Sequence, residues 1–489
     1  MNMSNIEPAP APATEPVSTY DSITQIAPKI ERGELSPVEL VEASLSRISQ
    51  HDSGPHGLNA FLGVWPDQAI ADARAAEKAI SSGGYLGPLH GIPVGLKDLI
   101  DVAGRETTGG SKVLAGNIAK SDSRVAKKLR AAGAILIGKL NLVEFAIGTT
   151  GLNPTTGDVK NPWDRTHITA GSSSGSAAAV ASGMIPAALG TDTGGSVRMP
   201  ASLCGISGLK PTYGRVSRSG VLDLSWSMDH IGPMTRTTAD CALMMNVLAG
   251  HDASDPASSH EPVPDFTSGL TEGLESLKIG VPTDYFFSDS VDSEVLALVR
   301  TAIDLMSRNG AEIVELPMPW AEKGRAINLG VIICEVVAVH EKIISEHADL
   351  YTPAVRSRIQ SGFNVPAIDY IRAQRARQWF NHHMAESMHQ VDVLITPTVP
   401  IQTPTIADCT PSPGNPGGGL ELPLFTGVFD VTGQPSHSVP CGFSTGGMPI
   451  GMMITGHPFD EVTVLRVGSA YETLTDWHQR PPADIPDAT

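Results

Sequence analysis

Apolar residues along this chain are arranged in two ways that predict different elements. They recur every three or four residues, as on one face of a helix, within residues 36–48, 123–133, 238–250 and 292–310. They form short continuous runs, as in buried strands, within residues 91–97, 134–138, 277–282, 311–317, 392–398, 437–443 and 449–456. Helices that alternate with short apolar strands predict an α/β fold whose sheet is covered by helices on both faces.

The predicted helices carry recognisable signals at their ends. Ser36, Pro37 and Glu39 have the spacing of a capping box with proline at the first helical position. Gly250 and Gly310 follow helical patterns and are typical helix stops. These signals fix where the elements begin and end more closely than the apolar period alone.

The helical pattern dominates residues 320–392, where little strand signal occurs. We expect a helical insertion there that acts as a lid over a site. We interpret residues 19–489 as one large domain that includes this insertion. Residues 1–18 are rich in proline and alanine and lack the basic and apolar regions of a signal peptide, so we expect a disordered leader.

Composition narrows the possible classes of function. The formal net charge of −18 repels phosphate backbones and excludes a general nucleic-acid binder. The most apolar window, residues 327–344, is interrupted by Glu335 and His340, so we expect no membrane span. The five cysteines are widely spaced without a CxxC pair, which favours free thiols in a reducing, cytoplasmic setting.

Two clusters of glycine and serine, Gly171–Gly175 and Thr193–Ser196, stand on either side of an apolar segment. Glycine lets a backbone approach a ligand closely, and a serine hydroxyl becomes a nucleophile when a base takes its proton. No histidine lies between residues 170 and 200. Lys97, at the end of an apolar run, is a candidate base because burial lowers the pKa of an amine and favours its neutral form.

Other motifs are better explained by ordinary structure. Residues 133–139 nearly match a phosphate-binding loop, but Leu140 stands where a serine or threonine should contact magnesium, which favours a buried strand. The pattern G-x-S-x-G occurs at 171–175 and 442–446. The first follows a turn-like segment and the second only a short strand, which disfavours a nucleophile elbow.

A group of acidic and histidine side chains raises the question of a metal site. His382, Glu386 and His389 fall on one face of a helical pattern, without the HExxH spacing of a zinc site. We interpret them as a solvated polar face and expect no metal.

Lys97 and the two serine clusters belong to a longer pattern. The matching segments are GIPVGLKD at 91–98, AGSSSGSAAAVASG at 170–183, the run at 190–217 that begins GTDTGGSVRMP, and HIGPMTRT at 230–237. In this order and spacing the chain resembles the amidase signature family, densely over residues 85–250 and more loosely near the C-terminus. The resemblance implies a large mixed β-sheet core covered by helices on both faces.

The resemblance also implies a Ser–Ser–Lys triad. Ser196 is then the nucleophile, Ser172 the bridging serine after a cis peptide bond from Gly171, and Lys97 the base. Ser173 is the alternative bridging serine, because Ala170 and Ser174 replace glycines that the family often has. The offset of 24 residues to Ser196 favours Ser172.

Backbone groups complete the site that the resemblance implies. The N–H groups of an oxyanion hole would come from four consecutive residues, Thr193, Gly194, Gly195 and Ser196. Asp192 and Arg198 are expected to brace this loop rather than to take part in the chemistry.

The reaction that the resemblance implies is hydrolysis of a carboxamide C–N bond, without metal or cofactor. Anilides, aliphatic amides and carbamates (a urethanase activity) all stay open as small-molecule substrates, and a homodimer is left open. Leu222, Leu224, Trp226 and Met228 are either core residues or the lining of an apolar pocket.

The alternative within the family is the glutamine-hydrolysing component (the A subunit) of a tRNA-dependent glutamine amidotransferase. That component typically has an aspartate where Pro423 stands here. We therefore favour a stand-alone amidase.

Overall fold

The structure is a computed structural model that describes residues 18, 20–54, 56–412, 417–483 and 485. The expected leader over residues 1–18 lies, apart from Ser18, outside the described residues.

A mixed β-sheet forms the centre of the molecule. In the described part of the chain it has 11 strands in the order β1-β3-β2-β4-β6-β5-β10-β11-β9-β7-β8. The strands are β1 (Phe61–Val64), β2 (Pro93–Lys97), β3 (Ile135–Leu140), β4 (Ala187–Asp192), β5 (Ser207–Lys210), β6 (His230–Thr235), β7 (Lys278–Pro282), β8 (Glu312–Leu316), β9 (Val393–Pro397), β10 (Ser436–Phe443) and β11 (Pro449–Gly456). Parallel and antiparallel pairs both occur, since β2 runs parallel to β3 and β4, whereas β4 runs antiparallel to β6.

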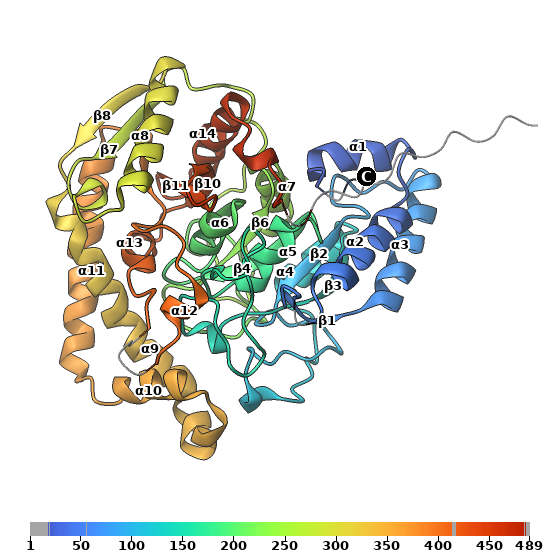
Figure 1. The fold of residues 1–489 in the computed structure, drawn as a ribbon, viewed down its shortest axis with the longest axis horizontal. Coiled ribbons are helices and arrows are strands. Elements are labelled where there is room, and N and C mark those ends of the chain that lie inside the picture. Colours follow the sequence, from blue (N-terminus) through green and yellow to red (C-terminus); the bar gives the residue numbers. More distant parts are fainter. Residues whose placement is uncertain (1–17, 19, 55, 413–416, 484, 486–489) are drawn as a thin grey trace, which may run out of the picture.

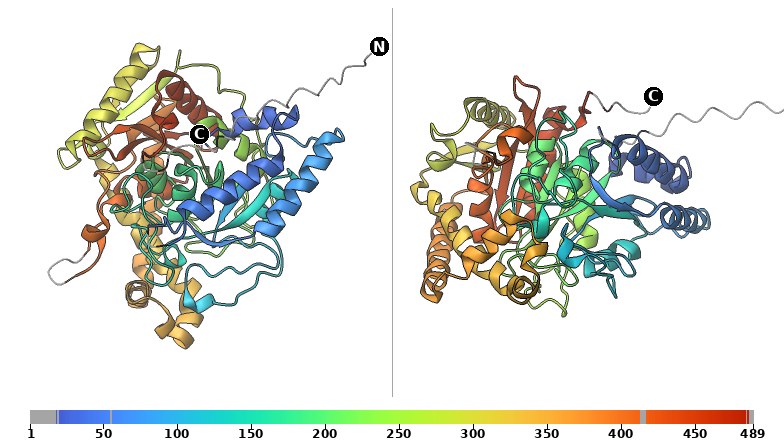
Figure 2. Two further views of the ribbon diagram at one scale, coloured as in Figure 1. Left: turned by 45° about the vertical axis from the view of Figure 1, so that its right-hand side comes forward. Right: turned by 60° about the horizontal axis from the view of Figure 1, so that its bottom comes forward.

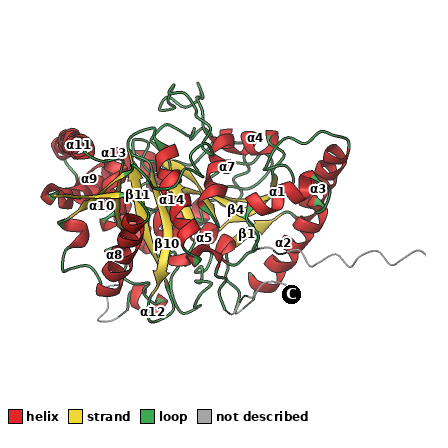
Figure 3. Ribbon diagram, turned by 90° about the horizontal axis from the view of Figure 1, so that it is seen from above, coloured by secondary structure: helices red, strands yellow, loops and turns green. Residues whose placement is uncertain are grey.

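Helices cover the sheet on both faces, as Figure 3 shows. They are α1 (Ile23–Glu31), α2 (Pro37–His51), α3 (Pro66–Ser81), α4 (Arg124–Ala131), α5 (Ser174–Ala181), α6 (Arg198–Cys204), α7 (Thr238–Leu248), α8 (Ser293–Arg308), α9 (Lys323–His347), α10 (Pro353–Gly362), α11 (Ala367–Met388), α12 (Ile406–Cys409), α13 (Thr426–Thr432) and α14 (Glu461–Leu474). The predicted fold class is therefore confirmed.

Local signals in the sequence place several of these elements. The Ser36 side chain accepts from backbone N–H groups at the start of α2, and Glu39 completes the capping box. Residues 133–139, which nearly match a phosphate-binding loop, lie mostly in the buried strand β3. Four strands were not predicted, namely β1, β4, β5 and β6.

The helices of residues 320–392 lie together at one end of the molecule. In Figure 1 and again in Figure 2, α9, α10 and α11 occupy the end opposite to α1, α2 and α3. The helical character expected for this range is present, while its movement as a lid stays a prediction. Among the helices that the structure describes, none is both long and apolar enough to cross a membrane.

The sheet explains where the candidate site lies. Strands β2 and β4 are parallel neighbours, so their carboxyl ends meet at the same edge. Lys97 is the last residue of β2, and Asp192 is the last residue of β4. The loop that follows Asp192 therefore passes close to the Lys97 side chain.

Candidate active site

Lys97 is fully buried and contacts three hydroxyl groups. Its Nζ atom lies 2.7 Å from Ser172 Oγ, 3.0 Å from Ser173 Oγ and 2.8 Å from Thr191 Oγ1. Burial lowers the pKa of Lys97 to about 7, against the opposing effect of the Asp192 and Asp229 carboxylates. Near neutral pH a large fraction of this amine is therefore uncharged.

The two adjacent serines use their hydroxyl groups differently. Ser173 Oγ donates to the Thr191 carbonyl at 3.1 Å and accepts from the Thr191 N–H at 3.2 Å. This fit needs Gly190, since a Cβ atom there would lie 2.7 Å from Ser173 Oγ. Ser172 Oγ has only the Lys97 contact within the described ranges, so its proton is not committed to the main chain. The Gly171–Ser172 peptide bond is cis.

Ser196 lies beside these serines without a hydrogen bond from its hydroxyl. Its side chain is largely buried, and its main-chain carbonyl accepts from the Ser173 N–H at 3.2 Å. In the part of the chain that the structure describes, Ser196 Oγ has no hydrogen-bond partner. The structure thus brings Lys97 and Ser172 together directly, and holds Ser196 next to them through the main chain.

The expected oxyanion loop differs from expectation at Gly195. The Gly195 N–H donates to Asp192 Oδ1 at 2.6 Å, so this donor is already used. The N–H groups of Thr193, Gly194 and Ser196 have no acceptor among the residues described. Three of the four expected donors are therefore free for a ligand.

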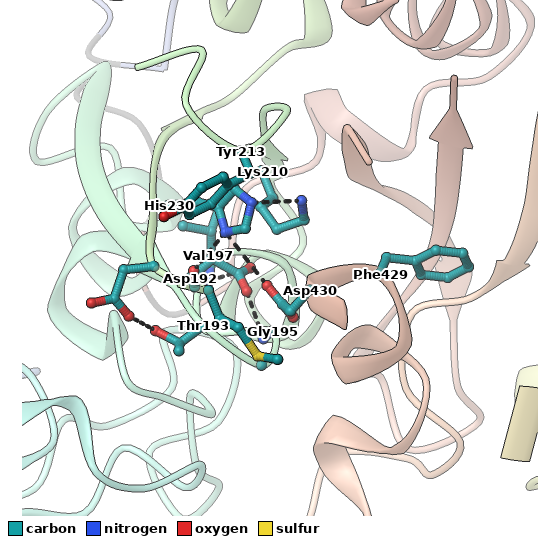
Figure 4. A network of polar contacts seen from close by, with 12 residues as sticks. Asp192, Thr193, Gly195, Val197, Lys210, Tyr213, His230, Phe429 and Asp430 are labelled. Atoms are coloured by element: carbon teal, nitrogen blue, oxygen red, sulfur yellow. Dashed lines mark hydrogen bonds and ion pairs between the residues drawn. The ribbon is translucent and has the colours of Figure 1, made fainter. Parts of the chain in front are cut away.

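Asp192 and Arg198 brace this loop, as expected, and Figure 4 shows Asp192 beside Gly195 and Val197. Asp192 accepts the N–H groups of Gly195, Val197 and Arg198. The Arg198 Nη2 atom lies 2.9 Å from Asp192 Oδ1 and 2.7 Å from Asp430 Oδ2, and all three side chains are fully buried. Burial alone would raise the pKa of Asp192, but the Arg198 guanidinium lowers it below its usual range.

A cavity of about 520 Å³ opens onto Ser196. It is bordered by residues 146–149, by the loop of Ser196, by α9 and α10, and by residues 420–424, including Pro423. The helical insertion therefore forms one wall of the site.

The apolar residues proposed for a pocket are divided between different places. Leu224 lines the cavity, whereas Leu222 borders a separate narrow space. Met228 is buried in the core, and Trp226 is 42% exposed at the surface. His382 Nε2 lies 3.1 Å from Glu386 Oε1 on α11, and both side chains are exposed, which agrees with a solvated polar face.

Two arginines that sequence reasoning missed border the cavity. Arg325, on α9, is half-buried and donates to Asn328 Oδ1 at 2.6 Å, and Arg358, on α10, donates to the Ile147 carbonyl at 3.1 Å. Neither makes an ion pair with an acidic group of the described residues. Burial lowers the pKa of Arg325 to about 10, so it stays charged at neutral pH. Because helical arginines usually face solvent, no local pattern indicates this placement.

The fold and this site place the protein in a class of enzymes in which a mixed α/β sheet carries a buried lysine next to serine hydroxyl groups. The sequence model of the family "Amidase" matches residues 39–465. This chain belongs to that family.

Individual relatives are similar along nearly the whole chain. An amidase of Pseudomonas putida is 43% identical over 467 residues, which cover 94% of this chain and 97% of that protein. The A subunit of the glutamyl-tRNA(Gln) amidotransferase of Chloroflexus aggregans is 41% identical over 487 residues, covering 95% and 98%. The solved structure of the peptide amidase from Stenotrophomonas maltophilia superposes with a TM-score of 0.83 at 31% identity, covering 94% and 98%.

Proposed function

We propose that this protein hydrolyses the C–N bond of small-molecule amides through an acyl-enzyme on Ser196. The observation that carries the proposal is the buried Lys97 amine, which contacts the Ser172 hydroxyl at 2.7 Å and has a pKa lowered to about 7. An amine with this pKa can accept a proton at neutral pH. The family supports the same reaction.

The proposed relay moves one proton through two serines. Neutral Lys97 takes the proton of Ser172, which takes that of Ser196, while Ser196 Oγ bonds to the amide carbon. The C–N bond then breaks, and the amine leaves with a proton returned along the relay. Water attacks the resulting ester by the same path, which releases the carboxylic acid and restores Ser196.

Ser172 is the better bridging serine of the adjacent pair. The Ser173 proton is donated to a main-chain carbonyl, whereas the Ser172 hydroxyl contacts only the Lys97 amine in the described residues. The negative oxygen that forms during attack is proposed to bind the free N–H groups of Thr193, Gly194 and Ser196.

The charges at the cavity narrow the substrate within this class. Arg325 and Arg358 have no acidic partner in the described residues and border a cavity that is otherwise largely apolar. A guanidinium group binds a carboxylate strongly where water is scarce. We therefore favour amides or carbamates that carry a carboxylate at some distance from the scissile bond.

Glutamine hydrolysis is the second candidate function. It is favoured by the 41% identity to a component of a glutamyl-tRNA(Gln) amidotransferase and by the two arginines, since glutamine has both an amide and a carboxylate. Pro423 stands at the cavity where the family alternative typically has an aspartate for the glutamine amino group. We therefore rank the stand-alone amidase first.

A matched pair of substrates tests the proposal. The 4-nitroanilides of glutaric acid, with a free carboxylate, and of pentanoic acid share the reactive carbonyl and the leaving group. We expect the purified chain to cleave the glutaric anilide with a kcat/KM at least about tenfold higher, as expected for a charge-assisted contact. Arg358→Gln should remove this preference, and Arg356→Gln, on the same helix but outside the cavity lining, should keep it.

The same assay separates the candidates. Primary amides, carbamates and glutamine complete the panel, and cleavage of glutamine alone would favour the amidotransferase component. No cleavage of any member would contradict an independent amidase. All five cysteines are free, four of them buried, which supports the proposed reducing, cytoplasmic setting.

A further inference from the structure

Each main-chain carbonyl of the loop over residues 193–196 is held by a different group. The pairs are Thr193 O with Asn328 Nδ2 at 3.0 Å, Gly194 O with Thr426 Oγ1 at 2.7 Å, Gly195 O with Met199 N at 2.7 Å, and Ser196 O with Ser173 N at 3.2 Å. Of these donors, only Asn328 comes from the helical insertion, residues 320–392.

A held carbonyl also fixes the next N–H group. A trans peptide unit is planar, and its C=O and N–H bonds point in opposite directions. The Thr193 carbonyl and the Gly194 N–H belong to one such unit. When Asn328 binds the carbonyl, the Gly194 N–H is directed away from the Asn328 amide, and it is one of the free donors of the loop.

The Asn328 side chain is well suited to hold a fixed position. It is fully buried on α9, and its Nδ2 atom also lies 3.3 Å from Met228 Sδ. Its Oδ1 atom accepts from Arg325 Nη1 at 2.6 Å. Gly194 leaves little spare room, since a Cβ atom there would lie 3.3 Å from Asn328 Oδ1. The amide thus links an arginine of the cavity to the loop of Ser196.

We propose that Asn328 is a positioning residue for the oxyanion hole. The helical insertion supplies this residue to the loop over residues 193–196. This rests on the proposed amidase function. Asn328 does not touch the substrate; it keeps the Gly194 N–H aimed at the developing negative oxygen. A donor that is positioned in this way acts on the transition state far more than on the bound substrate.

Asn328→Asp is the sharpest variant. The carboxylate keeps the shape of the amide and can still accept from Arg325, but it cannot donate to the Thr193 carbonyl. We expect kcat with the pentanoic 4-nitroanilide, which has no carboxylate for Arg325 to bind, to fall about 100-fold, with KM changed less than about threefold. Asn328→Ala should lose a similar factor. Asn364→Asp, an exposed position of the same insertion, is the matched control and should keep native kcat.

Ligand binding separates positioning from a merely structural role. Butylboronic acid, which matches the pentanoyl chain, becomes tetrahedral and anionic when Ser196 adds to it. Its affinity should fall in both Asn328 variants by the factor lost in kcat/KM, while the affinity for the product pentanoate stays within about threefold. Should one variant fail to fold, the other carries the same comparison.

Two results would overturn the inference. One is native kcat in Asn328→Asp; the other is an equal loss of affinity for the boronic acid and for the product. Either leaves the proposed function standing if the native chain is active and Ser196→Ala is not. Conversely, an inactive native chain that still binds the boronic acid, with weaker binding in Asn328→Asp, would contradict only the amidase proposal.

Discussion

Lys97 and Lys210 are alike in burial and differ in their partners. Each is the last residue of a strand, β2 or β5, and each side chain is fully buried. Burial lowers the pKa of both amines to about 7. Lys97 contacts three hydroxyl groups, whereas Lys210 Nζ lies 2.5 Å from the Gln434 carbonyl, 3.2 Å from the Pro211 carbonyl and 3.3 Å from a histidine.

The three atoms that contact Lys210 Nζ accept hydrogen bonds and have no proton to give to an amine. A carbonyl oxygen has no proton to give. His230 Nδ1 lies 3.2 Å from the Asp192 carbonyl, so this nitrogen carries the ring proton and Nε2 accepts from Lys210 (Figure 4). Lys210 therefore serves as a donor that links the main chain at Gln434, just before β10, to His230 of β6. A lowered pKa alone does not distinguish the two amines; the hydroxyl partners of Lys97 support its proposed role as the base.

The largest effect expected is that of Ser196→Ala, which removes the proposed nucleophile but leaves both lysines in place. Turnover should fall by about 10⁴-fold or more. Mass spectrometry of the quenched native enzyme should show an acyl adduct on the peptide that contains Ser196, and the variant should show none. An adduct on another serine would show that this other serine, and not Ser196, is the nucleophile.

The next largest effect is expected from replacing Lys97. Lys97→Arg keeps the charge and the donors, but a guanidinium group cannot be deprotonated in a protein. We expect Lys97→Arg and Lys97→Ala both to lose about 10³-fold in kcat, with native circular dichroism. Near-native turnover of Lys97→Arg would mean that Lys97 acts only as a fixed charge.

A smaller effect distinguishes the two adjacent serines. Ser172→Ala should lower turnover about 100-fold, since it breaks the proton relay. Ser173→Ala removes contacts to Lys97 and Thr191 and should cost less than about tenfold, because these contacts are not part of the relay. The reverse order of the two losses in steady-state kinetics would shift the bridging role to Ser173.

The smallest effect should be that of Lys210→Met. It removes a buried amine with the same lowered pKa as Lys97, yet we expect kcat/KM to change by less than about threefold, since no proton transfer is lost. Thermal unfolding checks that the variant is folded. A loss as large as that of Lys97→Ala would make Lys210 part of the chemistry and end the contrast between the two lysines.

The sequence predicted most of the apolar strands, although not the short β1 (FLGV), and missed the strands built of small residues. Strands β3 and β9 are rich in isoleucine, leucine and valine, which identify buried strands. Strand β4 reads AALGTD, and β5 reads SGLK, with few residues that favour strands. A Cβ atom at Gly190 in β4 would lie 2.7 Å from Ser173 Oγ and 2.9 Å from Met234 Sδ, a constraint that appears only in three dimensions.

The candidate site was predictable where it follows a local motif. Lys97, Ser172 and the loop after Asp192 lie in segments whose spacing resembles the family. Asn328 and Arg325 stand on α9, and their contact with the loop depends on how that helix packs, which no local pattern records. The use of the Gly195 N–H by Asp192 was missed for the same reason.

The pH dependence of kcat/KM tests the central claim most directly. Lys97 must be neutral to accept a proton, and burial lowers its pKa from the usual 10.5 to about 7. The rate should therefore rise with pH, about tenfold per unit at low pH, and level off above about pH 7. The same profile should persist in Lys210→Met, which removes the other amine of similar pKa. A native rate that is independent of pH between about 5 and 9, or a profile that disappears in Lys210→Met, would contradict the account.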